Sequence, residues 1–359
     1  MSEVLKVTGG KKLKGTIKVS GSKNAVLPIM AATILTDDEC VVSNVPDLSD
    51  VRVMNDVIKS LGGKIEIKNG VLKSKNNDIK SFRAPYELVR TMRASIYVMG
   101  SLLGKYGYAE VSLPGGCVIG DRPINLHLSG FEKMGAKVTI EHGYIKAEAK
   151  KLKGADIYLD VVSVGATANL MLAAVLAEGK TIIRNAASEP HIVDLGNFLN
   201  KMGAKVSGHG TKEIKITGVK NLHGCEYSVV ADYIEAGTFL ILSAMNGGGI
   251  VVDGAPAEDI EIVISKLKEA GFNVKNDKGG LVVEGLKRPK SVDIETLPYP
   301  GFPTDLQSQW MVLMTIADGA SIIRETIWEN RFMHVPELNR MGADIKIEGN
   351  IAVVRGVEK

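Results

Sequence analysis

The chain has 359 residues, of which 45% are apolar and 24% charged, which is close to the globular average and excludes wholesale disorder. At roughly 150 residues per domain, this length predicts two domains. The net charge of +3 gives no electrostatic footprint for nucleic acid. An uncharged run from Val161 to Ala177 is too short and too polar for a membrane span, which needs roughly 20 apolar residues.

The amino terminus and the cysteines bear on location. Glu3 and the lack of an early apolar stretch argue against a secretory signal. The three cysteines, Cys40, Cys117 and Cys225, are odd in number and far apart, so they form neither a disulfide framework nor the paired spacing of a zinc site. A reducing cytoplasm is the simplest interpretation.

A signature that ends a helix occurs five times along the chain. In each copy a Leu, Met or Ala precedes a glycine, and a short alternating strand follows; the glycines are Gly62, Gly135, Gly203, Gly271 and Gly342. Their separations are 73, 68, 68 and 71 residues. A glycine just past a helix favours the left-handed cap, which residues with a Cβ adopt less easily.

The rest of each unit of about 70 residues also repeats, as strand, helix, strand, helix, strand, strand. The first helix of each unit is apolar nearly all round, which predicts burial on most sides. We therefore expect an α/β fold with these helices inside and the sheets outside. Five units is an unusual count, because a unit without its neighbour leaves an apolar face bare. Either a sixth unit is absent or five units are complete.

Two cations stand at the starts of predicted buried helices. Lys23 and Asn24 precede the first such helix, and a lysine at a helix N-terminus makes a natural anion site. The alternative is a surface lysine with Asn24 as the helix cap. Arg93 occupies the same place in the second unit, where it opposes the helix dipole and needs an anionic partner or solvent.

A glycine-rich loop, PGGCVIGDRP, contains Cys117 and Arg122. A nearby cation lowers the pKa of a thiol, so this context predicts a chemical role for Cys117. Cys40 and Cys225 lack such a context and are expected to be buried and inert. His127, just after the loop, could be either a ligand or a core residue.

The last stretch with reactive side chains lies in the fifth unit. Asp305 precedes the fifth buried helix, where it could be a helix cap or a group that orients a substrate hydroxyl. Arg331 lies in a loop of the same unit.

At these stretches, and over essentially the whole chain, the sequence resembles the UDP-N-acetylglucosamine enolpyruvyl transferases. The matching segments are GSKNAVLP, APYELVRTMRAS, PGGCVIGDRPINLH, VSVGATAN, EPHIVDLGNFLNKMGA, YPGFPTDLQSQ and ENRFMHVPEL. The shikimate-pathway enolpyruvyl transferase is similar in its repeat but lacks this cysteine loop.

The resemblance implies two inside-out α/β domains of three repeats each, with the active site between them. Residues 22–229 would form the first domain, and residues 1–21 with 230–359 the second. Five of six repeats would then be present, so the second domain is expected to be unstable and the activity much reduced. The alternatives are a truncated, non-catalytic paralogue that binds the nucleotide sugar, or an incomplete fragment of the enzyme.

The implied reaction transfers the enolpyruvyl group of phosphoenolpyruvate to the 3′-hydroxyl of UDP-N-acetylglucosamine and releases phosphate. It passes through a tetrahedral intermediate and is the first committed step of peptidoglycan synthesis, and so serves cell-wall biogenesis, cell shape and cell division. The resemblance implies no cofactor and no metal, a cytoplasmic location, small-molecule partners without nucleic acid or membrane, and alkylation by fosfomycin.

The resemblance also implies roles for individual residues. Cys117 would be the proton donor, Asp305 would meet the 3′-hydroxyl, and Lys23 and Arg122 would hold phosphoenolpyruvate. The substrate-binding set would be Lys23, Asn24, Arg93, Arg122, Pro123, Ile124, Asn125, Leu126, His127, Val162, Ser163, Val164, Gly165, Asp305, Ile327, Trp328 and Arg331.

Four positions depart from the family pattern. Val161 stands where many members carry Lys, Asn125 replaces a common Asp, Tyr233 a common Arg, and Trp328 a common Phe. The change at Val161 would weaken one charged contact with the nucleotide.

Overall fold

The computed structural model describes residues 4, 6–113, 124–254, 257–277, 279–285 and 288–358. Within them, five copies of the predicted unit follow one another. The five glycines of the repeat signature, Gly62, Gly135, Gly203, Gly271 and Gly342, have φ between +90° and +99°. Each therefore adopts the left-handed conformation that was predicted for the end of a helix.

The units follow the predicted order of elements. The first has β1 (Gly15–Lys18), α1 (Lys23–Ala32), β2 (Glu39–Ser43), α2 (Ser49–Ser60), β3 (Lys64–Lys68) and β4 (Val71–Lys75). The second has β5 (Arg83–Ala84), α3 (Tyr86–Val89), α4 (Tyr97–Tyr106), β6 (Tyr108–Ser112), α5 (Asn125–Lys133), β7 (Lys137–Glu141) and β8 (Tyr144–Glu148). The third has β9 (Asp156–Tyr158), α6 (Val164–Ala174), β10 (Lys180–Arg184), α7 (Pro190–Lys201), β11 (Lys205–Ser207) and β12 (Glu213–Thr217).

The last two units repeat this plan. The fourth has β13 (Glu226–Ser228), α8 (Tyr233–Met245), β14 (Ile250–Asp253), α9 (Glu261–Glu269), β15 (Phe272–Asp277) and β16 (Gly280–Gly285). The fifth has β17 (Ile294–Glu295), α10 (Gln307–Met314), β18 (Ala320–Arg324), α11 (Val335–Arg340), β19 (Asp344–Glu348) and β20 (Ile351–Arg355). Short 3₁₀ turns lie at Thr33–Leu35, Arg93–Ile96, Ala257–Ile260 and Thr304–Leu306.

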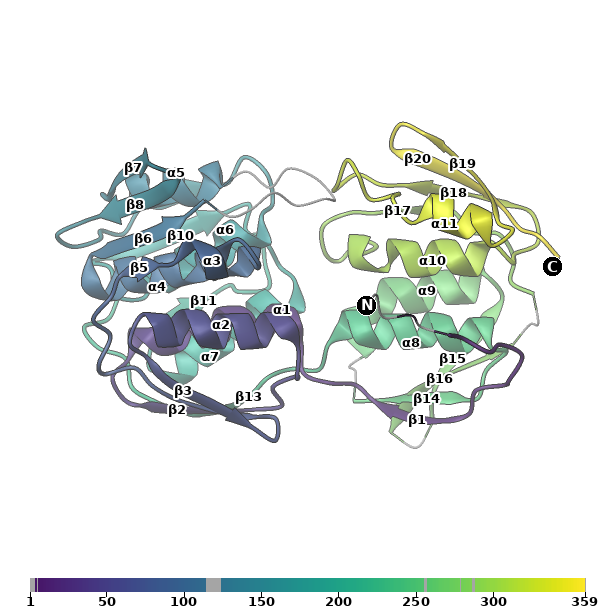
Figure 1. Ribbon diagram of the computed structural model, residues 1–359, viewed down its shortest axis with the longest axis horizontal. Helices are drawn as coiled ribbons and strands as arrows, with labels where there is room; N and C mark the ends of the chain where they lie inside the picture. The colour runs from purple at the N-terminus through teal and green to yellow at the C-terminus, as the bar shows by residue number, and fades with distance from the viewer. Residues whose placement is uncertain are drawn as a thin grey trace.

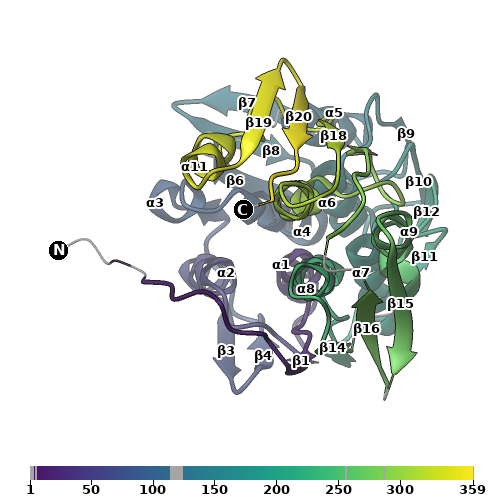
Figure 2. The same cartoon turned by 90° about the vertical axis from the view of Figure 1, so that its right-hand side faces the viewer.

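Each unit builds a four-stranded sheet, and the described residues contain five of them. The strand after the first helix lies second in the sheet. It pairs in parallel with a short edge strand and antiparallel with the last strand of its unit, as β10 does with β9 and β12. The sheets lie outside and the first helices inside, as the all-round apolar pattern predicted (Figures 1 and 2). In α6, every residue from Ala166 to Ala174 is buried.

Two edge strands are exchanged between the first and fourth units. β1 pairs in parallel with β14, with Gly15 opposite Ile250, whereas β13 pairs in parallel with β2, with Glu226 opposite Val41. The chain therefore crosses twice between two lobes, and the crossing segments meet at a bridge between Gly21 and Ala231 (Figure 1). Buried apolar side chains correspondingly form two clusters, one drawn from residues 25–229 and one from Val19 and residues 233–354.

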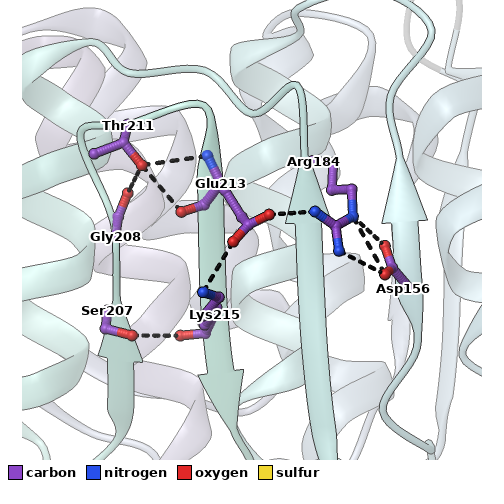
Figure 3. A network of polar contacts seen from close by, with 7 residues as sticks. All are labelled: Asp156, Arg184, Ser207, Gly208, Thr211, Glu213 and Lys215. Carbon is purple, nitrogen blue, oxygen red and sulfur yellow. Dashed lines mark hydrogen bonds and ion pairs between the residues drawn. The ribbon is translucent and has the colours of Figure 1, made fainter.

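The outer faces of the sheets are polar. On the sheet of the third unit, Arg184 of β10 pairs with Asp156 of β9 (Nε to Oδ1, 2.9 Å) and with Glu213 of β12, and Lys215 Nζ lies 2.9 Å from Glu213 Oε1 (Figure 3). These groups are exposed, so solvent screens the pairs and they contribute little to stability. Their positions show that this face of the sheet is the one exposed to solvent.

The central helices differ in burial between the lobes. In the first lobe α1, α4 and α6 all contact one another, whereas in the second lobe α8 and α10 contact each other. Phe239, Leu242 and Met245 of α8 are only partly buried. The second cluster therefore has a less completely covered apolar face than the first.

A buried carboxyl group fastens the exchanged strand β13 to the first lobe. Asp194 of α7 is fully buried, and its Oδ1 accepts a hydrogen bond from the Tyr227 hydroxyl of β13 (2.5 Å). Its Oδ2 accepts from the backbone N–H of Val230 (3.3 Å). Burial raises the pKa of Asp194 to about 6 from an ordinary value of 3.8.

This shift predicts the pH dependence of stability. The native state holds the Asp194 proton more tightly than the unfolded chain, so the free energy of unfolding falls as the pH rises through this window. The full effect is roughly 3 kcal/mol. Asp194→Asn keeps an acceptor for Tyr227 and removes the ionisation. The free energy of unfolding would be measured by urea titration at about pH 4 and at about pH 7. Relative to the wild type, the variant should be more stable at the higher pH than at the lower pH.

The matched control is Asp160→Asn, which changes an exposed carboxyl group of the same lobe. In this variant, the free energy of unfolding should change between the two pH values by as much as it does in the wild type. If Asp194→Asn shifts stability equally at both pH values, the carboxyl does not carry the predicted pH dependence.

Candidate active site

The two crossings place Lys23, the first residue of α1, beside Asp232 at the start of α8. The backbone N–H of Lys23 donates to Asp232 Oδ2 (3.1 Å), while Asp232 Oδ1 accepts from the N–H groups of Ile234 (2.9 Å) and Glu235 (3.2 Å). One carboxylate thus caps α8 and holds the start of α1. Burial raises the pKa of Asp232.

The ammonium group of Lys23 is accessible. Its side chain is 44% exposed, and Nζ lies 3.7 Å from Oδ2 of Asp50, which is too long for a strong pair. Asn24 is half-buried in the same first turn. A weakly paired lysine at a helix N-terminus suits an anionic ligand.

His191 lies at the start of α7, where the two lobes meet. Neighbouring Ser188 donates from Oγ to the backbone carbonyl of Tyr299 in the other lobe (3.2 Å). His191 is 4% exposed, and neither ring nitrogen has a hydrogen-bond partner among the described residues. Burial lowers the pKa of His191 to about 4; the charge of Lys23 lowers it further and that of Asp305 opposes this. His191 therefore lies within electrostatic reach of one charged residue from each lobe.

Asp305 lies in the 3₁₀ turn Thr304–Leu306, not at the cap position of α10, which is Leu306. Its Oδ1 pairs with Arg331 Nη2 at 2.7 Å, with the two side chains 45% and 17% exposed. Of the two alternatives for Asp305, a helix cap or a group that orients a hydroxyl, the structure therefore contradicts the first. Arg331 holds the carboxylate instead and leaves Oδ2 without a partner among the described residues.

Glu325, at the end of β18, organises the loops around Asp305. It is 2% exposed and accepts four hydrogen bonds. Its Oε1 accepts from Thr296 Oγ1 (2.7 Å) and from the N–H groups of Ile327 (2.8 Å) and Trp328 (3.2 Å). Its Oε2 accepts from Thr304 Oγ1 (2.9 Å). One buried carboxylate thus fixes both the turn that carries Asp305 and the loop that carries Ile327.

A second group of candidate residues lies at the start of α6. Ser163 caps this helix, with Oγ accepting from the N–H of Ala166 (3.2 Å). His127 of α5 packs over Gly165, so closely that a Cβ there would lie 3.2 Å from His127 Nε2. Burial, with the charge of Arg93, lowers the pKa of His127 to about 4. The structure thus brings Arg93, His127 and residues 163–165 together.

Three predicted site residues, Cys117, Arg122 and Pro123, lie outside the described residues. Directly after them, Ile124 is half-buried, and Asn125, where α5 begins, is exposed. Leu126, Val162, Val164, Ile327 and Trp328 are partly buried. Two of the positions that depart from the family pattern differ in exposure. Val161 is 62% exposed, whereas Tyr233 is 6% exposed and packs edge-on against Tyr299.

The described residues contain no group of three or more His, Cys, Asp or Glu side chains placed to hold a metal ion. Within the same residues, no helix is long and apolar enough to cross a membrane. What the site does offer is accessible cations, such as Lys23, and a carboxylate oriented by an arginine. Such a set can bind phosphate and carboxylate groups and receive a proton from a hydroxyl.

Sequence reasoning missed four residues that shape these sites: Asp232, His191, Glu325 and, in α6, Asn169, whose amide nitrogen lies 3.0 Å from His127 Nδ1. Of these, Asp232 offered a signal, because an Asp directly before an apolar helix is a common cap. The roles of Glu325 and Asn169 depend on partners far away in sequence, and the position of His191 depends on the meeting of two lobes.

Comparisons with known proteins agree with this architecture. The family model for EPSP synthase (3-phosphoshikimate 1-carboxyvinyltransferase) matches residues 7–359. The enolpyruvyl transferase NikO from Streptomyces tendae superposes with a TM-score of 0.86 over 97% of this chain and 83% of its own, at 20% identity. EPSP synthase from Acinetobacter baumannii superposes with a TM-score of 0.72 over 98% of this chain and 83% of its own, at 19% identity. At such identities the two structures establish the fold alone.

The chain belongs to the EPSP synthase family of carboxyvinyltransferases, and it is a transferase. Within that family its similarity is to UDP-N-acetylglucosamine 1-carboxyvinyltransferases. It is 57% identical to such an enzyme of Caldanaerobacter subterraneus subsp. tengcongensis over 96% of this chain and 83% of the relative. It is 52% identical to that of Halothermothrix orenii over 97% of this chain and 84% of the relative.

The role of Glu325 can be tested with Glu325→Gln. The neutral amide keeps one acceptor oxygen and places a donor where the other oxygen was. That donor either faces the N–H groups of Ile327 and Trp328, which only donate, or reverses the hydrogen bond with the Thr304 hydroxyl, and in both cases the charge-assisted bonds are lost. We expect a loss of about 1–3 kcal/mol in the free energy of unfolding, and a larger proportional loss of turnover, because the turn of Asp305 and the loop of Ile327 both lose their anchor. Chemical denaturation and turnover would be measured on the same preparation.

Glu329→Gln is the matched control, since Glu329 is exposed in the same loop. It should change neither quantity appreciably. Wild-type stability in Glu325→Gln would show that the four hydrogen bonds are not needed to hold these segments.

Proposed function

We propose that the chain transfers the enolpyruvyl group of phosphoenolpyruvate to the 3′-hydroxyl of UDP-N-acetylglucosamine and releases phosphate, the first committed step of peptidoglycan synthesis. The observation that carries this proposal is the similarity, at 51–57% identity over 96–99% of the chain, to enzymes that bear the name of this activity. Accessible Lys23 and the Asp305–Arg331 pair supply the charges that the reaction requires.

The reaction is an addition followed by an elimination. In the addition, the 3′-oxygen bonds to C2 of phosphoenolpyruvate while the methylene carbon takes a proton, giving a tetrahedral ketal. In the elimination, that carbon loses a proton and the bond between C2 and the phosphate oxygen breaks. Cations that bind the phosphate and carboxylate stabilise the charge on both substrate and leaving group.

Cys117 donates the proton to the methylene carbon, and Lys23, Asn24 and Arg122 hold phosphoenolpyruvate. Asp305 accepts the hydrogen bond of the 3′-hydroxyl through Oδ2, because Arg331 occupies Oδ1. The support for this role is the orientation of the carboxylate by an arginine that is itself only 17% exposed. An ionised carboxylate within hydrogen-bond reach of a hydroxyl is suited to act as a general base.

The nucleotide sugar binds at the start of α6 and the adjoining segments. Arg93, the backbone of residues 122–126, His127 and residues 162–165 contact it, with Ile327 and Trp328 closing the far side. Support comes from the cap geometry of Ser163 and from the packing of His127 over Gly165. We further propose that residues 22–229 form one domain and that residues 1–21 with 230–359 belong to the other.

The first test is phosphate release from phosphoenolpyruvate with and without UDP-N-acetylglucosamine. Release should require both substrates, and Cys117→Ala should lower the rate by at least about 100-fold, the usual contribution of a general acid. Cys225→Ala is the control, because Cys225 lies next to β13 and is partly buried. Release that persists in Cys117→Ala would contradict the role of this thiol.

Alkylation by fosfomycin gives a second, independent test. The epoxide should add once, at Cys117, because Cys40 is fully buried and Cys225 partly buried among strands. A thiolate near a cation is the better nucleophile. Peptide mass spectrometry after labelling would locate the adduct, and modification of Cys40 or Cys225 in the folded chain would contradict the assignment.

A second candidate function is a module that binds the nucleotide sugar without turnover. The observation that favours it is that Arg93, His127 and Ser163 all lie in the first lobe, while Asp305 and Arg331 lie in the second. Calorimetry with UDP-N-acetylglucosamine separates the two, since this alternative requires binding together with no phosphate release.

A further inference from the structure

The side chain of Asn169 in α6 is fully buried and hydrogen-bonded at both ends. Its Oδ1 accepts from the N–H of Gly100 (2.8 Å), and its Nδ2 donates to the carbonyl of Ile96 (3.0 Å). A backbone N–H can only donate and a carbonyl can only accept, so these two contacts fix which end of the amide is oxygen. The orientation of Asn169 therefore follows from the backbone of the neighbouring unit.

Close packing of α4 against α6 keeps this amide in place. A Cβ on Gly100 would lie 2.4 Å from Asn169 Oδ1 and 2.3 Å from its backbone oxygen. The two helices can approach this closely because Gly100 has no side chain. An amide held between two backbones at this separation has little freedom to rotate.

The fixed amide determines which ring nitrogen of His127 carries the proton. Asn169 Nδ2 lies 3.0 Å from His127 Nδ1. An amide nitrogen donates and does not accept, so Nδ1 must be the acceptor, and the neutral ring must carry its proton on Nε2. The pKa of His127, lowered to about 4 by burial and by the charge of Arg93, keeps the ring neutral near pH 7.

The Nε2–H group faces the proposed nucleotide-sugar site. It lies over Gly165 in the first turn of α6, and no acceptor among the described residues is hydrogen-bonded to it. We propose that Asn169 is a positioning residue that holds His127 in the Nε2–H tautomer, so that Nε2 donates to an acceptor oxygen of the nucleotide sugar. The identity of the ligand rests on the proposed function, whereas the tautomer rests on the contacts of Asn169.

Asn169→Asp reverses the polarity of the contact. The carboxylate accepts from Nδ1–H, so in the neutral ring Nε2 becomes an acceptor and faces the ligand's acceptor oxygen. At about pH 9 the KM for UDP-N-acetylglucosamine should rise about tenfold or more, with a smaller change in kcat, because one hydrogen bond is replaced by a repulsive contact. As the pH falls and the ring takes a second proton, Nε2–H returns and the rise in KM should shrink.

That pH profile separates positioning from a structural role. A loss of packing alone would raise KM by the same factor at every pH. In wild type, where the amide opposes protonation of the ring, no such pH-dependent step should appear in KM near neutral pH. A pH-independent rise in Asn169→Asp, or no rise, would overturn the proposal.

Two variants at His127 provide a test that leaves Asn169 intact. The side-chain amide of His127→Gln can place a donor near the position of Nε2, whereas that of His127→Asn is too short and falls near the position of Nδ1. The KM of the Gln variant should therefore be several-fold lower than that of the Asn variant, a difference that corresponds to the free energy of about one hydrogen bond. Equal values would overturn the proposal.

The tautomer can also be read directly by nitrogen-15 NMR of histidine-labelled chain, with the signal of His127 identified by its loss in His127→Gln. The proposal requires protonated Nε2 and unprotonated Nδ1 in the wild type, and the opposite assignment overturns it. If the wild-type chain neither releases phosphate nor binds UDP-N-acetylglucosamine in calorimetry, the ligand assignment fails with the proposed function. The NMR measurement decides the role of Asn169 in either case.

Discussion

The exchange of two edge strands between the lobes is the constraint on which the rest of the structure depends. β1 completes the sheet of β14, and β13 completes the sheet of β2, so neither sheet is whole without a segment that arrives from the other lobe. The crossing segments also bond to each other, through Ser22 N to Val230 O (2.8 Å) and Asp232 N to Ser20 O (2.9 Å). A slip of one residue would turn the inward-facing side chains of an edge strand outward, so its register is fixed and the lobes are tied together along one side.

This tie explains where the proposed active site lies. α1 and α8 begin within two residues of the bridge between Gly21 and Ala231, so the first turns of two central helices, one from each lobe, start side by side. Asp232 serves both helices with one carboxylate. Lys23 is thereby presented at a helix start where the lobes meet, and the positive end of the helix dipole adds to its charge.

Buried polar groups fix the segments that carry the candidate site residues. Lys23 and Asp305 are 44% and 45% exposed, whereas Glu325 and Asn169 are almost completely buried. Hydrogen bonds inside a low-dielectric interior are strong and costly to leave unmade, so Glu325 and Asn169 can each fix two separate segments. Within the described residues, the Lys23 side chain keeps only a long contact of its own, with Asp50 at 3.7 Å.

The repeat could be predicted from the sequence because its signals are local. A glycine that ends a helix, as at Gly62 and Gly342, indicates a left-handed conformation at that residue. In the same way, a helix that is apolar all round is predicted to be buried. The exchange of β1 and β13 has no such local signal, because both are short edge strands whose partners lie far away along the chain. The crossing was expected from the resemblance to a family alone.

The features that could not be predicted from the sequence are hydrogen bonds between residues that lie far apart along the chain. Asp305 has the sequence signal of a helix cap because it precedes an apolar helix, but its carboxylate is held by Arg331, 26 residues away. Glu325 needs Thr296 and Thr304, and Asn169 needs Gly100 and Ile96. No periodicity in sequence encodes such a set, because these hydrogen bonds depend on how loops and helices pack in three dimensions, within a unit for Glu325 and between units for Asn169.

The charges of the site are neutralised within each lobe rather than across the boundary. Lys23 has Asp50 of its own lobe at 3.7 Å, and Asp305 has Arg331 of its own lobe at 2.7 Å. An exposed, long ion pair such as Lys23–Asp50 contributes little, so breaking it to free Lys23 would cost little. The shorter, less exposed pair of Arg331 with Asp305 is the harder to break and keeps the carboxylate oriented. At the proposed site, an anionic substrate would therefore draw on Lys23 of one lobe while the carboxylate of the other lobe stays oriented by Arg331. Buried His191 lies within electrostatic reach of both Lys23 and Asp305.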